Sequence, residues 1–87
     1  MKDAAMQSLP NAPQSAAVAS AESDALAIQA LEDRAEQRFV ALRAELATRG
    51  QAEEATRSPE FREWMAARVQ TDEAWGRWAM AMDALQV

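Results

Sequence analysis

The stretch RGQAEEATRSPE, residues 49–60, separates two long segments that are rich in helix-forming residues. Its second residue, Gly50, is typical of the position just after a helix C-terminus. Arg49 follows Glu45 by four residues, which is the favoured order for an ion pair on a helix. A first helix is therefore predicted to end at residue 49. The residues from Gln51 to Thr56 fit either a loop or an extension of that helix.

The same stretch ends on a helix start. Ser58 is a typical N-cap, Pro59 suits the first helical position, and Glu60 is favourable in the first turn near the positive end of the helix dipole. These signals predict a connection over residues 50–58 and a second helix over residues 59–86.

The segment before the connection, residues 21–49, contains neither proline nor glycine, and Ser20 or Ser23 is its expected N-cap. Its large apolar residues recur every three or four positions, which predicts one buried stripe along a helix. Leu26 and Val40 fall off this stripe. We expect the stripe to pack inside a hairpin; its members are Ile28, Leu31, Ala35, Phe39, Leu42 and Leu46.

The second segment has a heptad-like pattern typical of coiled coils and contains all three tryptophans of the chain. Arg68 and Thr71 interrupt the pattern in the middle. Thr71, Asp72 and Glu73 also resemble a helix start, so a break at Thr71 competes with one continuous helix. We interpret the row as a seam for a partner or for self-association; it comprises Phe61, Trp64, Arg68, Thr71, Trp75, Trp78, Met82 and Leu85.

Two helices of similar length with a short connection predict an all-α, antiparallel two-helix hairpin over residues 21–87. A break at Thr71 predicts three short helices instead. Residues 1–20 read as a flexible tail, in which Met6 and Leu9 are the candidate anchors for a partner. A hairpin this small buries too little apolar surface alone, so we expect it to complete a helical bundle, as a homodimer or with a protein partner.

The residue types exclude much chemistry. The chain of 87 residues has no cysteine, histidine or tyrosine. The usual zinc ligands and the usual general base are therefore missing, and we expect no enzyme, no metal site and no cofactor. The acidic pairs lie at helix starts, in the connection or on polar faces, as solvated carboxylates usually do.

The net charge of −5 argues against direct nucleic-acid binding, which needs basic side chains to neutralise phosphates. No apolar run is long enough to span a membrane, so a cytoplasmic protein is expected. Eight arginines against one lysine, with many alanines, are typical of GC-rich coding sequences. A bacterial source, or a phage or plasmid as a mobile element within one, is therefore expected.

These observations favour a non-enzymatic protein that acts through protein–protein binding, as an adaptor, a chaperone-like protein or an inhibitor. One alternative is a structural homo-oligomer subunit. Another is an acidic inhibitor that mimics nucleic acid, although arginines interleave its carboxylates. Gly76, between two tryptophans, is either a tolerated small residue or a place where a second backbone approaches closely.

Overall fold

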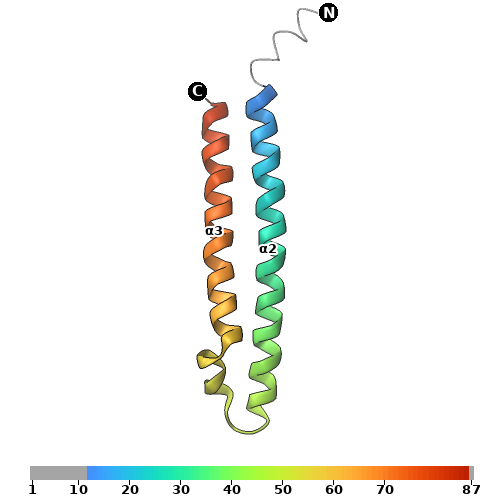
Figure 1. The fold of residues 1–87 in the computed structure, drawn as a ribbon, viewed down its shortest axis with the longest axis vertical. Helices are drawn as coiled ribbons and strands as arrows, with labels where there is room; N and C mark the ends of the chain where they lie inside the picture. The colour runs from blue at the N-terminus through green and yellow to red at the C-terminus, as the bar shows by residue number, and fades with distance from the viewer. Residues whose placement is uncertain (1–11, 87) are drawn as a thin grey trace, which may run out of the picture.

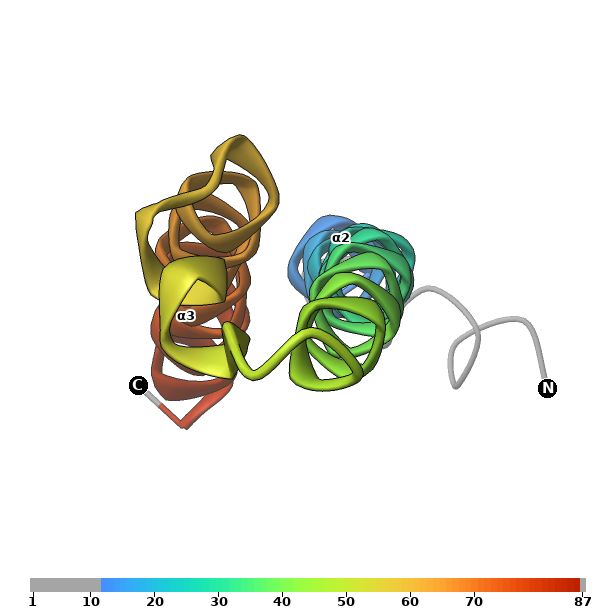
Figure 2. The same ribbon diagram turned by 90° about the horizontal axis from the view of Figure 1, so that it is seen from below.

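The computed structural model describes residues 12–86. Helix α2 spans Ala12–Ala47, a 3-10 helix η2 spans Ala52–Arg57, and helix α3 spans Pro59–Leu85. Figure 1 shows α2 and α3 side by side and antiparallel, with η2 at the closed end. The predicted all-α hairpin is confirmed. Figure 2, viewed along the helices, shows the two long helices side by side with η2 at their near end.

The end of α2 follows the predicted glycine signal. Gly50 has a φ of 71°, in the left-handed region that glycine adopts without a steric penalty. The Gln51 amide donates to the Leu46 carbonyl at 2.9 Å, and the Gly50 amide donates to the Ala47 carbonyl at 3.0 Å. This pair of bonds is the Schellman motif, which satisfies carbonyls at the end of a helix. The Arg49 guanidinium pairs with the Glu45 carboxylate at 3.0 Å, as predicted.

The start of α3 is also confirmed. The Ser58 hydroxyl accepts a hydrogen bond from the Phe61 amide at 3.1 Å and donates one to the Ala55 carbonyl at 2.6 Å. One buried side chain thus joins the last turn of η2 to the first turn of α3. The segment Gln51 to Thr56 is neither an open loop nor an extension of α2, because most of it belongs to η2.

The predicted start of the first helix at residue 21 is wrong. Helix α2 begins at Ala12 and runs through both candidate N-caps, Ser20 and Ser23. The added turns are rich in alanine, and Val18 within them is partly buried. The flexible-tail prediction is therefore wrong for residues 12–20. Its remaining part, with Met6 and Leu9, lies outside the described residues.

Two rows of side chains form the contact between the long helices. Both rows follow alternating spacings of three and four residues, the pattern of an antiparallel coiled coil. The α2 row consists of Val18, Ala21, Ala25, Ile28, Glu32, Ala35, Phe39, Leu42 and Leu46, each buried or partly buried. The α3 inner row consists of Trp64, Ala67, Thr71, Ala74, Trp78 and Ala81, again each buried or partly buried.

Helix α3 is continuous through Thr71, so the alternative of three short helices is not adopted. Thr71 is 7% exposed, and its hydroxyl donates to the Ala67 carbonyl at 3.1 Å. It therefore bonds back to the preceding turn and does not cap a new helix. The α3 inner row also keeps its spacing on both sides of Thr71, so a break would move one half of it away from α2.

The interior between the helices is thin. The buried apolar residues of the described chain are Ala25, Ala35, Phe39, Ala55 and Ala74, and no large side chain is fully buried. The radius of gyration is 20.1 Å, whereas a compact chain of this length has about 12 Å. The hairpin is thus an elongated pair of helices without a closed core.

Candidate protein-interaction surface

Three aromatic rings hold the helices together near the closed end. The Phe39 ring of α2 stacks on Trp64 with centroids 5.1 Å apart and lies 5.4 Å from Phe61. Phe61 and Trp64 meet edge to face at 6.3 Å. Such pairs add to the free energy gained from burial alone. Phe39, at 6% exposed, is the only large apolar residue of the described chain that is buried.

A second aromatic pair lies farther along α3. Trp75 and Trp78 are perpendicular, with centroids 5.5 Å apart. The Trp75 indole nitrogen donates to the Gln29 side-chain oxygen of α2 at 3.0 Å. Because this hydrogen bond crosses between the helices, it fixes the Trp75 ring along the edge of the contact. Trp75 and Trp78 are both partly buried.

The side of α3 next to this edge carries a row that we name the α3 side stripe. Its spacings alternate between four and three residues, so its members lie on one side of the helix. Phe61, Met65, Trp75 and Met82 are partly buried, whereas Arg68, Asp72 and Ala79 are exposed. The stripe consists of Phe61, Met65, Arg68, Asp72, Trp75, Ala79 and Met82.

Arg68 lies at the middle of this stripe. Its guanidinium carbon is 5.9 Å from the centroid of the Trp64 ring, within reach of a cation–π interaction, and one of its nitrogens is 4.0 Å from the Met65 sulfur. The ion pairs of the described chain are Arg38–Glu63, Arg49–Glu45 and Arg57–Glu54. Arg68 and Asp72 therefore have no ion-pair partner within residues 12–86.

The predicted seam divides between two sides of α3. Trp64 and Trp78 belong to the inner row, which faces α2. Phe61, Arg68, Trp75 and Met82 belong to the side stripe. Leu85, which ends the helix, is 38% exposed.

The predicted hairpin stripe on α2 needs one correction. Ile28, Phe39, Leu42 and Leu46 belong to the α2 row. Leu31 does not, because it is 52% exposed and Glu32 occupies the row in its place. The row alternates spacings of three and four residues, so the position four residues after Ile28 is Glu32, one residue beyond Leu31. Leu26 and Val40, each 54% exposed, lie off the row as expected.

Sequence reasoning missed the alanines of the contact. Ala67, Ala74 and Ala81 recur every seven residues in the inner row, so the signal was present in the printed sequence. Small residues at such positions let two helix backbones approach more closely than large ones do. The Gln29 partner of Trp75 had no comparable local signal, because it depends on the register between the helices.

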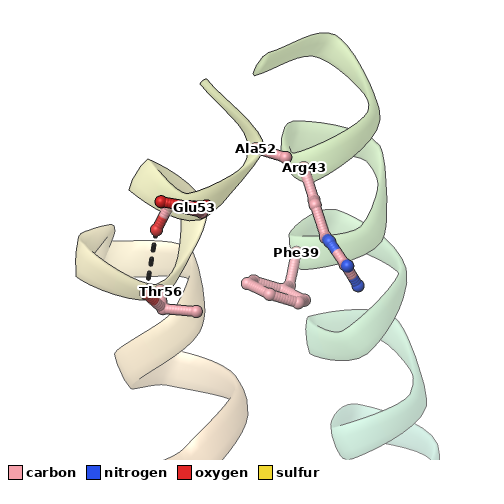
Figure 3. Close-up of a pocket in the computed structure, with 5 residues that line it drawn as sticks. All are labelled: Phe39, Arg43, Ala52, Glu53 and Thr56. Carbon is pink, nitrogen blue, oxygen red and sulfur yellow. Dashed lines mark hydrogen bonds between the residues drawn. The ribbon is translucent and has the colours of Figure 1, made fainter. Parts of the chain in front are cut away.

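Two hollows flank the helix contact. One has a volume of about 330 Å³ near the closed end and is lined by Phe39, Arg43, Ala52, Glu53 and Thr56. Figure 3 shows the Phe39 ring pointing from α2 towards η2, where Thr56 donates to the Glu53 carbonyl. The other hollow, about 370 Å³, lies along the opposite edge between Leu31, Arg38 and Glu63. Both are open grooves between side chains, and the second is also lined by the polar residues Arg34 and Gln70.

The described residues contain no group of three or more acidic side chains placed to hold a metal ion. None of the helices in residues 12–86 combines the length and apolar character needed to cross a membrane. The Trp64 indole nitrogen is buried and has no hydrogen-bond partner within that part of the chain.

The fold and this surface define a helical hairpin whose apolar side chains are only partly covered by its own two helices. Comparisons of the chain with protein-family models, with curated proteins and with solved structures found no match.

Proposed function

We propose that this chain is a non-enzymatic helical protein that acts by binding other protein chains, as an adaptor, a chaperone-like protein or an inhibitor. A cytoplasmic location in a bacterium or its mobile elements is part of this proposal. The observation that carries it is the thin interior: within residues 12–86, four of the five buried apolar residues are alanines, and no large side chain is fully buried.

The apolar side chains that the hairpin leaves exposed support this proposal. In the part of the chain that the structure describes, six large ones are between 38% and 73% exposed: Leu26, Leu31, Val40, Val69, Met80 and Leu85. Each fully buried side chain of this size gains about 1.5–3 kcal/mol relative to an exposed one. Packing against another chain therefore offers a large gain in free energy that folding of the single hairpin does not realise.

The residue types of the α3 side stripe suit a binding surface. Tryptophan and arginine are the residues most enriched where single side chains dominate binding, and methionine adapts to irregular surfaces. Trp75 is also held in place by Gln29, at 3.0 Å, before any partner arrives. A side chain that is already ordered loses less conformational entropy on binding.

The test is site-directed photo-cross-linking of the full chain in cells of its source. A benzophenone amino acid replaces Met65 on the side stripe in one variant and Arg77, an exposed residue off the stripe, in the matched control. We expect a discrete adduct with another protein chain from position 65 and none from position 77. Free chain alone at both positions would contradict the proposal. Mass spectrometry of the adduct identifies the partner.

A further inference from the structure

The positions of the α3 side stripe are spaced symmetrically about its centre. Arg68 and Asp72 occupy the middle, and Met65 and Trp75 flank them at equal spacing. Phe61 and Ala79 follow, again at equal spacing. A helix that packs antiparallel on a copy of itself brings each such pair together twice, because a twofold axis makes every contact reciprocal.

We propose that the partner on this stripe is a second copy of the chain. The two α3 helices then pack antiparallel about a twofold axis midway between Arg68 and Asp72, and the arginine of each copy pairs with the aspartate of the other. This proposal rests on the proposed function, since it identifies the protein chain that binds the side stripe.

Charge selects the antiparallel arrangement. Arg68 and Asp72 are exposed and have no ion pair within the described chain. They form no ion pair with each other on their own helix, where an arginine four residues before an acid is the less favourable order. A parallel, in-register copy would place arginine against arginine and aspartate against aspartate. The antiparallel copy places opposite charges together at both symmetric positions.

Side-chain size agrees with the same register. Phe61 of one copy lies opposite Ala79 of the other, so a large ring meets a small residue. Met65 lies opposite Trp75, and methionine adapts well to an aromatic surface. The paired segment from residue 61 to residue 79 is about 27 Å long at 1.5 Å per residue. Contact along this length covers the partly exposed aromatic rings from both hairpins.

The deciding experiment measures the mass and dissociation constant of the purified full chain by sedimentation. We expect a dimer. The variants Arg68→Asp and Asp72→Arg each place like charges across the axis, and each raises the dissociation constant by about tenfold or more. The double variant R68D/D72R restores opposite charges and returns the dissociation constant towards that of the original chain. Circular dichroism tests whether every variant keeps its helices.

Matched controls separate the contact from net charge. Arg77→Asp and Glu73→Arg make the same changes of charge on exposed residues of α3 away from the stripe, and we expect both to remain dimers. Asp72→Arg is the more decisive single variant, because Arg68 also contacts Trp64 within the hairpin.

Because the chain has no cysteine, introduced cysteines report the register directly. A mixture of Arg68→Cys chains and Asp72→Cys chains should oxidise to the mixed disulfide in preference to either symmetric product.

A dimer unaffected by both single charge changes would overturn this interface. A monomer at all concentrations would overturn self-association. If that monomer still forms a photo-cross-linked adduct with a different protein through position 65, the proposed function stands and only the identity of the partner is wrong. If neither occurs, both proposals fail.

Discussion

At the scale of single residues, the two glycines differ in backbone conformation. Gly50 has a φ of 71°, whereas Gly76 lies inside α3, and a Cβ built on it meets no atom within 4 Å. We predict that Gly76→Ala raises the free energy of unfolding by about 1 kcal/mol, because alanine is the better helix former. Gly50→Ala should lower it by about 1–2 kcal/mol, because a Cβ disfavours the left-handed conformation. Urea unfolding at one fixed protein concentration measures both.

The Gly76 variant also tests the idea that a second backbone crosses α3 closely at that point. No such backbone lies within the hairpin itself. If Gly76→Ala weakens self-association while leaving helix content unchanged, then another chain does approach there, and the proposed side stripe is not the main contact.

Ser58 makes two hydrogen bonds with one hydroxyl, one as acceptor from Phe61 and one as donor to Ala55. We predict that Ser58→Ala lowers the free energy of unfolding by about 1–2 kcal/mol, since it removes an N-cap and removes the hydroxyl that donates to the carbonyl of the buried Ala55. Ser58→Thr retains both functions and should cost less. An unchanged urea midpoint in Ser58→Ala would show that this cap contributes little to the fold.

At the scale of the elements, the contact between α2 and α3 depends most on Phe39. This ring touches both Phe61 and Trp64 and is 6% exposed. We predict that Phe39→Ala lowers the free energy of unfolding by about 3–5 kcal/mol, the usual cost of removing a buried aromatic ring. The neighbouring Val40, 54% exposed, provides the control.

Val40→Ala should change that free energy by no more than about 0.5 kcal/mol, as surface substitutions usually do. Thermal melts followed by circular dichroism compare the two variants. Equal effects of both substitutions would mean that Phe39 does not hold the helices together.

The ends of the helices were predictable where one local signal determines them. Gly50 and Ser58 act through their own backbone and hydroxyl groups, so the sequence around them identified the turn and the restart correctly. The start of α2 was not predictable in this way, because residues 12–20 contain few large apolar side chains. Of residues 13–20, Val18 alone is partly buried, so these turns depend mainly on the helix propensity of their alanines.

The candidate surface was predictable only in outline. The spacing placed Trp64 and Trp75 on one broad face of α3, but it could not divide that face between α2 and solvent. The division depends on the alanines Ala67 and Ala74, which let α2 approach at the inner row. Apolar spacing alone gives more weight to large residues than to small ones, and here the small ones mark the contact.

At the scale of the whole molecule, the described chain is a long pair of helices with a radius of gyration of 20.1 Å and no closed core. Small domains that lack disulfides or metals usually gain stability from association. The exposed apolar residues lie along both helices, from Leu26 and Val40 on α2 to Val69 and Met80 on α3. A second chain that packs along the length of the hairpin covers more of this surface than contact at either end.

This argument predicts that the stability of the fold depends on protein concentration. If folding and dimerisation are coupled, a tenfold increase in concentration favours the dimer by about 1.4 kcal/mol through mass action. For a dimer of this size that corresponds to a rise in Tm of about 3–6 °C. The measurement is a series of thermal melts over a hundredfold range of concentration, followed by tryptophan fluorescence.

The Asp72→Arg chain should show a smaller concentration dependence, because its copies repel each other at the centre of the side stripe. A Tm that is independent of concentration in the original chain would show that the hairpin folds alone, and its exposed apolar residues would then be available for a different protein.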